Sequence, residues 1–202
     1  MSEKKPSLAL FDFDGTITTK DSLVEFIQFA VGKTNYYRGL LFLSPMLLQY
    51  KLKIIPNHLA KERLLSYFFK DWKIERFKKI ANEYSCKHIN SIIRPKALEE
   101  IQWHQEQGNE VVIVSASINT WLQPWCEQQK VKLISTELEV KNNLITGKFS
   151  TKNCYGVEKA NRVHEKYDLK QYHSIYAYGD SSGDKDLLKL AKHSYYKPFR
   201  KN

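Results

Sequence analysis

Two aspartates stand two positions apart, directly after a short apolar run near the start of the chain. Residues 7–12 predict a buried strand, and Gly15 permits a sharp turn after it. Asp12 and Asp14 would share one face if the strand continued, at the carboxyl end where open α/β sheets bind their ligands. Two carboxylates this close repel each other, so they stay ionised together only beside a cation, and oxygen ligands suit Mg²⁺.

Paired carboxylates of this kind are suited to phosphoryl transfer. One carboxylate can carry a covalent phosphoryl group, which divides one difficult displacement into two easier ones. A second acid nearby can protonate the leaving oxygen. A solvated, aspartate-rich turn would show the same short pattern, so the rest of the chain decides between the two interpretations.

Two later strands also end in polar residues. Residues 110–115 form a run rich in valine that ends at Ser115, as expected for a parallel strand covered on both faces. Residues 175–179 lead into Asp180, and Asp184 follows four positions later. Taken alone, a serine at a strand end and acids before a helix are explained by helix capping. Together with the first motif, they indicate a shared site.

In this order, the three segments resemble the motifs of the haloacid dehalogenase superfamily, whose members are mostly Mg²⁺-dependent phosphohydrolases. The segments are residues 12–16, 115–117 and 179–184. The resemblance implies that Asp12 is the nucleophile and that Asp14 is the general acid/base, with its backbone carbonyl on the metal. It also implies that Ser115 holds the phosphate. The implied magnesium ligands are Asp12, Asp14, Asp180 and Asp184, of which Asp184 either ligates the ion or orients its shell.

The family also places a lysine between the second and last motifs, where it neutralises the phosphoryl group. Lys159 is the best match, because it opens a predicted helix in that interval. Lys152 is its rival, and Lys166 lies too far along the helix. A lysine is the least specific of these signals, since most lysines are solvated surface residues.

The remainder of the sequence predicts an α/β fold: a doubly wound, Rossmann-like parallel sheet with a small helical cap. Residues 1–20 and 93–202 are expected to form the core, and residues 21–92 a cap with helical spacing of apolar residues. Within the core, residues 138–149 predict a hairpin around Asn142 and Asn143, and residues 193–196 an edge strand. Pro124 is expected to kink a helix over 119–130 or to delay its start. Asn57 is expected to be the N-cap residue of a helix in the inserted segment.

A helical cap inserted after the first motif resembles the phosphoserine-phosphatase-like branch, subfamily IB. Members of that branch include small-molecule phosphatases and a phosphatidylglycerophosphate phosphatase. In it, an acidic cap residue grips the substrate amine; Asp21 falls near that position and Glu25 follows, both as weaker selectivity candidates. We therefore expect a Mg²⁺-dependent hydrolase of a small phosphomonoester, a metabolite or a head group. A lipid phosphatase at the membrane surface and a phosphotransferase remain open alternatives.

Composition limits the partners and the compartment. The chain has 202 residues, and 42% are hydrophobic, which is enough for a real core. Residues 1–6 are polar and Cys86, Cys126 and Cys154 are widely spaced, so we expect reduced thiols in a cytoplasmic protein. The net charge of +10 fits phosphorylated substrates, peripheral contact with an anionic membrane at its inner face, or solubility alone. No nucleic-acid motif is present, no nucleic-acid partner is expected, and the oligomeric state is undefined.

The segment 40–50 is the most apolar part of the expected cap, and the cap carries twelve Lys/Arg against six Asp/Glu. This segment is too short to cross a membrane. Core packing within the cap is the first interpretation of the segment, and a surface helix resting on anionic lipid is the second.

Overall fold

The computed structural model describes residues 5–200 and centres on a five-stranded parallel sheet. The strand order is β3-β2-β1-β6-β7, and every neighbouring pair is parallel. The predicted doubly wound α/β fold is therefore confirmed, with the expected edge strand at its end. The strands are β1 (Leu8–Phe11), β2 (Glu110–Ile118), β3 (Lys132–Thr136), β6 (Ile175–Gly179) and β7 (His193–Tyr196).

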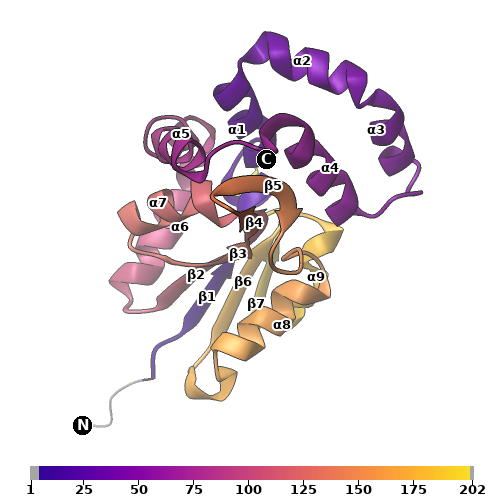
Figure 1. The fold of residues 1–202 in the computed structure, drawn as a ribbon. Helices are drawn as coiled ribbons and strands as arrows, with labels where there is room; N and C mark the ends of the chain where they lie inside the picture. Colours follow the sequence, from indigo (N-terminus) through magenta and orange to yellow (C-terminus); the bar gives the residue numbers. More distant parts are fainter. Residues whose placement is uncertain (1–4, 201–202) are drawn as a thin grey trace.

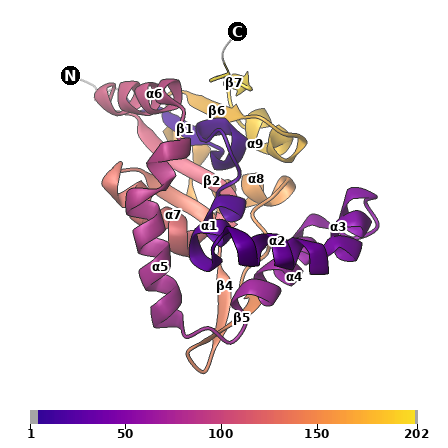
Figure 2. The same ribbon diagram turned by 90° about the horizontal axis from the view of Figure 1, so that it is seen from above.

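Helices cover both faces of this sheet, because side chains alternate along its central strands. Ala9 and Phe11 face a core that includes residues of α6 and α7, whereas Leu8 and Leu10 face a second core with residues of α8 and α9. Figure 1 and Figure 2 show these two helical layers. The helices are α6 (Pro95–Glu106), α7 (Asn119–Gln128), α8 (Val157–Lys166) and α9 (Lys185–Lys189).

The stretch between β1 and α6 is helical, as predicted. Figure 1 shows α1 to α4 above the carboxyl ends of the central strands, and α5 beside α7. Phe26 of α1 stacks on Trp121 of α7, with ring centroids 4.6 Å apart, so aromatic packing joins the inserted helices to the sheet-covering layer. The helices are α1 (Ser22–Val31), α2 (Lys33–Phe42), α3 (Ser44–Lys51), α4 (Asn57–Phe69) and α5 (Ile74–Lys87).

The two connections between the sheet and the inserted helices run side by side. Thr18 pairs with Ile93 in an isolated antiparallel bridge, and the Arg94 amide donates to the Ile17 carbonyl at 2.8 Å. The chain thus leaves and re-enters the sheet layer at one place. We propose that this pairing marks the boundary between core and cap, close to the expected division at residues 20/21 and 92/93.

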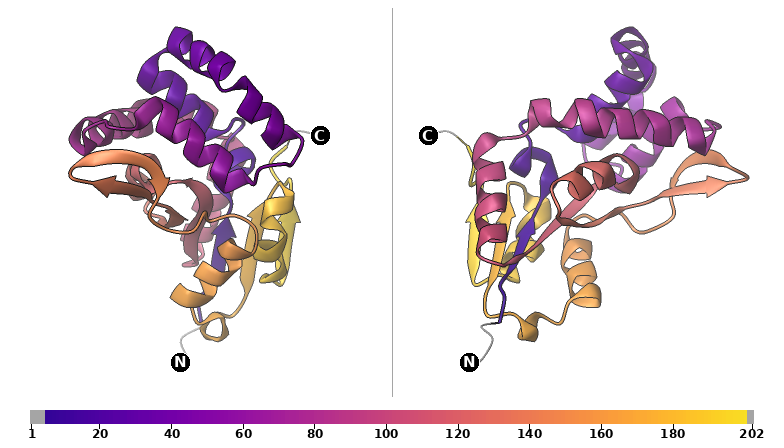
Figure 3. Two further views of the ribbon diagram at one scale, coloured as in Figure 1. Left: turned by 45° about the vertical axis from the view of Figure 1, so that its right-hand side comes forward. Right: turned by 90° about the vertical axis from the view of Figure 1, so that its left-hand side faces the viewer.

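A separate hairpin, β4 (Leu138–Lys141) and β5 (Leu144–Phe149), extends from the sheet and packs against α4. Asn142 and Asn143 form its turn with φ of 50° and 62°, the left-handed conformation that a tight hairpin requires. The predicted hairpin is therefore confirmed. Gly147 comes so close to α4 that an added Cβ would lie 2.3 Å from the Cα of Ser66. Figure 3 shows the hairpin projecting beneath the inserted helices.

Three local predictions need correction. Asn57 does not cap α4: Pro56 precedes the helix, and the Asn57 side chain hydrogen-bonds Tyr50 and Asn153 instead. Pro124 lies inside α7, which begins at Asn119, so the late start is wrong and the kink stays a prediction. Segment 40–50 is not mainly core, because Leu41, Phe42 and Leu48 are exposed. Among residues 5–200, no helix is both long enough and apolar enough to cross a membrane.

Candidate active site

The motif residues meet because their strands are neighbours in the sheet. Asp12 follows β1, Ser115 lies in β2, and Asp180 follows β6, and β2, β1 and β6 are adjacent and parallel. The carboxyl ends of these strands therefore bring the polar residues to one edge, beneath the inserted helices (Figure 1).

Asp12 and Asp14 reach this edge by a turn and not by a continued strand. β1 ends at Phe11, and residues 13–17 form an irregular turn in which Gly15 has φ of +84°. A Cβ on Gly15 would lie 2.6 Å from Oδ2 of Asp180, so the turn needs glycine for its backbone angle and for space. The turn directs the two carboxylates to different partners. The two aspartates therefore do not share one face of a continued strand, as was expected, but both still lie at the site.

Lys159 is the lysine that contacts the first aspartate. Its Nζ donates to Oδ1 of Asp12 at 2.5 Å and to Oδ1 of Asp184 at 2.8 Å, and all three side chains are buried. The Thr16 hydroxyl donates to the other Asp12 oxygen at 2.8 Å. Both oxygens of Asp12 are thereby oriented. Lys152, the rival candidate, lines a separate cavity, and Lys166 is exposed.

Burial and charge act in opposite directions on these groups. Burial raises the pKa of Asp12 to about 7, although the Lys159 charge lowers it. Burial also disfavours the charge of Lys159, but Asp12 and Asp184 outweigh this and raise the pKa of Lys159. For Asp184, burial acts against ionisation, yet Lys159 and the Ser181 hydrogen bonds hold its pKa below the usual value. The protein alone therefore stabilises the ionised form of Asp184. The ionised form of Asp12 would be stabilised by a further positive charge nearby.

Asp12, Asp180 and Asp184 form an acidic cluster. Each offers a carboxylate oxygen, and these atoms lie within 4.8 Å of one another. Burial and the charge of Asp184 raise the pKa of Asp180, although Arg200 donates to Asp180 Oδ2 at 2.6 Å and lowers it. Negative charge in the cluster is thus incompletely balanced by the protein. Hard oxygen donors with unbalanced charge fit Mg²⁺.

Asp184 also receives several hydrogen bonds from its own loop. The amides of Asp180 and Ser181 donate to its Oδ2 at 3.1 and 2.9 Å, and the Ser181 hydroxyl donates at 2.8 Å. These bonds fix the loop that carries Asp180. Of the two roles predicted for Asp184, this geometry favours orienting the metal shell.

Asp14 lies outside the acidic cluster and is held by two donors. Its Oδ1 accepts from the Ser22 amide and its Oδ2 from the Ser117 hydroxyl, both at 2.6 Å. Ser115 is fully buried, and its oxygen accepts from the Ser117 amide at 3.0 Å, which leaves its hydroxyl proton free to donate. A side-chain metal bond from Asp14 has no support in this geometry. The expected bond through its backbone carbonyl stays a prediction.

The two selectivity candidates have different surroundings. Asp21 caps α1 by accepting from the amides of Leu23 and Val24 at 2.9 and 3.2 Å. It also borders a cavity of about 160 Å³, whose other lining residues are Leu23, Val24, Leu47, Tyr50, Asn57, Ala60, Lys61 and Leu64. Glu25 does not line that cavity and pairs with Lys20 at 3.0 Å. The structure therefore leaves Asp21 as the better placed of the two.

Sequence reasoning missed four residues that hold the site together. Thr16 and Ser117 lie within the recognised motifs, but nothing in the pattern showed which carboxylate each would contact. Lys61 of α4 donates to the Ala116 carbonyl at 3.3 Å, between Ser115 and Ser117. Lys61 and Arg200 gave no signal, because their contacts bridge segments far apart in the chain.

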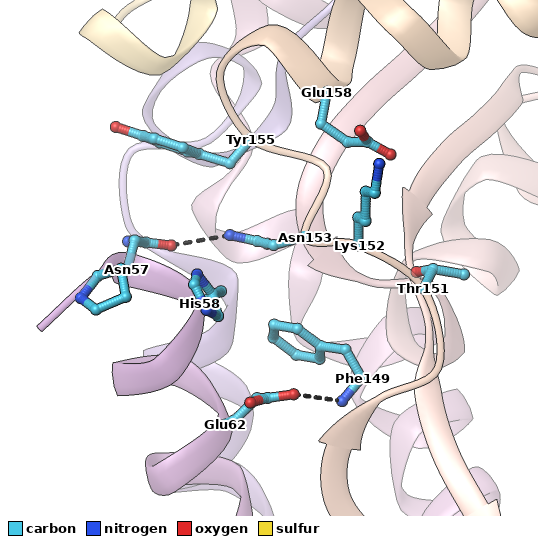
Figure 4. Close-up of a pocket in the computed structure, with 10 residues that line it drawn as sticks. Asn57, His58, Glu62, Phe149, Thr151, Lys152, Asn153, Tyr155 and Glu158 are labelled. Atoms are coloured by element: carbon cyan, nitrogen blue, oxygen red, sulfur yellow. Dashed lines mark hydrogen bonds between the residues drawn. The ribbon is translucent and has the colours of Figure 1, made fainter.

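A larger cavity of about 480 Å³ lies between the start of α4 and residues 149–158 (Figure 4). The side-chain Nδ2 of Asn153 donates to Asn57 Oδ1 at 3.1 Å across this cavity. The backbone amide of Phe149 donates to Glu62 Oε1 at 2.9 Å. None of the motif carboxylates lines it. Its polar contacts therefore fasten α4 to the sheet side of the molecule, beside the site.

Known proteins resemble this chain over nearly its full length. Protein CicA of Caulobacter vibrioides is 30% identical over 198 residues, which cover 97% of this chain and 88% of CicA. A protein of unknown function from Bordetella pertussis Tohama I superposes with a TM-score of 0.83 at 20% identity, covering 95% and 89% of the two chains. A phosphoserine phosphatase with bound substrate gives 0.69 at 20% identity, with 96% and 87% covered.

The two structural matches show a shared fold. The family model of the haloacid dehalogenase-like hydrolases matches residues 9–189, a range that contains every motif carboxylate and Lys159. Since that match spans most of the chain, the protein belongs to the haloacid dehalogenase-like hydrolases.

Proposed function

We propose that the protein is a Mg²⁺-dependent phosphomonoester hydrolase that works through an aspartyl-phosphate on Asp12. The observation that carries this proposal is the placement of Asp12: buried at a strand end, with both oxygens held by Lys159 and Thr16. Membership of a hydrolase family and a fold shared with a phosphoserine phosphatase support the same conclusion.

In the first step, a carboxylate oxygen of Asp12 forms a bond to phosphorus while the bond from phosphorus to the ester oxygen breaks. Asp14 gives its proton to that leaving oxygen. In the second step, Asp14 takes a proton from water, whose oxygen attacks phosphorus and releases Asp12 and inorganic phosphate. The Ser22 amide and the Ser117 hydroxyl keep the Asp14 carboxyl group in place for both transfers.

The other residues position and neutralise the phosphoryl group. Lys159 supplies a buried positive charge next to Asp12, and Ser115 has a hydroxyl proton to donate to a phosphoryl oxygen. Asp12 and Asp180 would hold Mg²⁺, with Asp184 orienting the shell around the ion and Asp14 contributing its backbone carbonyl. When bound, the ion would neutralise charge on the phosphoryl oxygens and on the carboxylates around it.

The leaving group would lie in the cavity beside Asp21. Its walls are mainly apolar, with a carboxylate from Asp21 and an ammonium group from Lys61. Burial raises the pKa of Asp21, the nearby charge of Asp14 adds to this, and Lys61 acts in the opposite direction. This lining favours substrates with an apolar portion, so a lipid-linked head group is a second candidate beside a small metabolite.

The test of mechanism is Asp12→Asn, assayed for phosphate release with Mg²⁺. We expect loss of nearly all turnover with an unchanged circular dichroism spectrum, whereas Asp168→Asn, at an exposed cap of another segment, should retain activity. Excess chelator should abolish turnover, and added Mg²⁺ should restore it. Full activity in Asp12→Asn or in chelator would contradict the mechanism.

The test of substrate is a panel containing phosphoserine, sugar phosphates, nucleotides and phosphatidylglycerophosphate. A clear preference for phosphoserine would contradict the argument from the apolar cavity. A second assay, with an added alcohol as acceptor, separates hydrolysis from phosphotransfer by comparing released phosphate with phosphorylated alcohol.

A further inference from the structure

The helices α2 and α3 expose an unusual amount of apolar surface. Among residues 5–200, seven of the fourteen exposed large hydrophobic residues fall between positions 37 and 54. Leu41 is 77% exposed and Phe42 is 71% exposed. A soluble monomer rarely keeps such residues together without a use for them. The seven residues, named here the α2–α3 surface, are Tyr37, Leu41, Phe42, Leu48, Tyr50, Leu52 and Ile54.

The opposite side of α2 is already occupied by the protein's own packing. Tyr36 and Gly39 are buried, and a Cβ on Gly39 would lie 2.3 Å from the ring of Phe68 in α4. A helix that covers a core on one side is normally polar on the other. Here the outward positions Tyr37 and Leu41, one turn apart, are apolar as well. The α2–α3 surface therefore resembles a contact face without its partner.

Charge identifies the partner. No Asp or Glu occurs between Glu25 and Glu62, a stretch that contains five Lys/Arg. Four of these, Lys33, Arg38, Lys51 and Lys53, are exposed, and none of the four makes an ion pair with any residue that the structure describes. An apolar surface within an acid-free basic stretch complements an anionic lipid surface. A second copy of the chain, meeting this face with the same face, would bring these cations together and repel.

The position of the surface agrees with a peripheral mode of contact. α2 and α3 lie at the outer edge of the inserted helices, away from the sheet (Figure 1 and Figure 2). They have 10 and 8 residues, too few for either to span a bilayer. Leu47 and Tyr50 of α3 also line the cavity that reaches Asp21. A membrane against this surface would therefore lie close to that cavity.

We propose that the α2–α3 surface docks the protein onto anionic phospholipid, with the apolar side chains in the interface and the four exposed cations beside the head groups. This docking needs no turnover. It is independent of the function proposed above, so the inactive Asp12→Asn variant should bind membranes as the wild type does.

Co-sedimentation with vesicles tests the proposal. We expect the full chain to bind vesicles of phosphatidylcholine mixed with phosphatidylglycerol, and to bind vesicles of phosphatidylcholine alone much more weakly. The variant Leu41→Ser, Phe42→Ser, Leu48→Ser should bind the mixed vesicles at least about tenfold more weakly. These side chains are exposed, so the variant should fold normally. The pair Lys51→Glu, Lys53→Glu should also weaken binding and reduce its dependence on salt.

Two matched controls separate the surface from general properties. Trp103→Ser, Val140→Ser, Tyr196→Ser removes the same number of exposed apolar side chains from scattered positions and should bind as the wild type does. Lys166→Glu, Lys170→Glu changes the net charge equally at exposed positions outside the insertion and should have a smaller effect than the α2–α3 pair.

Three results would overturn the proposal: no binding to the mixed vesicles, equal loss in the matched controls, or unchanged binding in the Leu41, Phe42, Leu48 variant. Light scattering after size exclusion addresses the competing occupant. A wild-type dimer that becomes monomeric in the serine variant would assign the surface to a second copy of the chain.

Discussion

Asp14 owes its position to donors from two separate segments of the chain. The Ser22 amide belongs to the start of α1, and the Ser117 hydroxyl belongs to β2, 103 residues after Asp14 in sequence. A carboxyl group that must give and then take a proton needs a fixed position relative to the reacting oxygens. At the scale of single residues, Ser117 is thus a positioning residue for Asp14.

Replacing Ser117 by alanine should lower turnover by about tenfold, because one hydrogen bond to a charged group is lost. We expect a larger effect on kcat than on KM. In the phosphorylation step, esters with poor leaving groups should suffer more, since they depend most on Asp14. The control is Ser22→Ala, which removes a neighbouring hydroxyl but keeps the Ser22 amide on Asp14. Equal losses in both variants would point to disturbed packing.

Sequence patterns could identify the residues of the candidate site better than their contacts. The pattern favours Lys159 over Lys152 because Lys159 opens a predicted helix, and the structure places it on Asp12. Ser117 was visible only as a neighbour of Ser115. Lys61 and Arg200 could not be found, because a side-chain contact between distant segments depends on the three-dimensional fold and leaves no local pattern.

At the scale of elements, the turn after β1 determines how the first motif is presented. Gly15 has φ of +84°, and its Cα faces the carboxylate of Asp180. The turn therefore links the first motif to the last through close backbone approach. Gly32 has a similar φ of +79° between α1 and α2, but an added Cβ there would meet nothing within 4 Å.

These two glycines give a matched pair of substitutions. Gly32→Ala carries only backbone strain, because φ of 79° with ψ of 152° is a conformation open essentially to glycine, and this should cost about 1–3 kcal/mol of unfolding free energy. Gly15→Ala carries strain of its own at φ of 84° and ψ of −19° and also displaces Asp180, so it should lose most activity, whereas Gly32→Ala should retain it. Urea unfolding and phosphate release measure the two effects. If both variants behave alike, the contact between Gly15 and Asp180 has no functional weight.

Elements were predictable where local chemistry sets them. β1, β2, β6 and the Asn142-Asn143 hairpin follow directly from apolar runs and turn residues. The turn over residues 13–17 could not be derived in detail, because its path depends on Asp180 and on the Ser22 amide. The exposed face of α2 and α3 was also beyond local prediction: apolar content alone does not show which side a helix buries.

At the scale of the whole molecule, a buried polar chain joins α6 to the sheet. Asn109 donates to Nδ1 of His104 at 3.0 Å, which fixes the ring proton on Nε2, and Nε2 then donates to the Tyr178 hydroxyl at 2.9 Å. Tyr178 in turn donates to Glu100 at 2.7 Å. His104 is fully buried, and burial lowers its pKa to about 4. All of these hydrogen bonds can form together only while the His104 ring is neutral.

The stability of the protein should therefore fall in acid. An unfolded histidine takes up a proton near pH 6.5, whereas folded His104 resists protonation until about pH 4. Between these values the unfolded state binds more protons, so stability is present above pH 6.5 and is lost as the pH falls toward 4. We expect His104 to account for about 2 kcal/mol of unfolding free energy lost between pH 7 and pH 4.5.

Urea unfolding at several pH values measures this loss. His104→Gln retains a donor and an acceptor but cannot titrate. The carboxylates contribute equally to both proteins. The unfolding free energy that the variant loses over the same pH range should therefore be smaller by about 2 kcal/mol. Identical acid dependence in wild type and variant would show that His104 is not the group responsible.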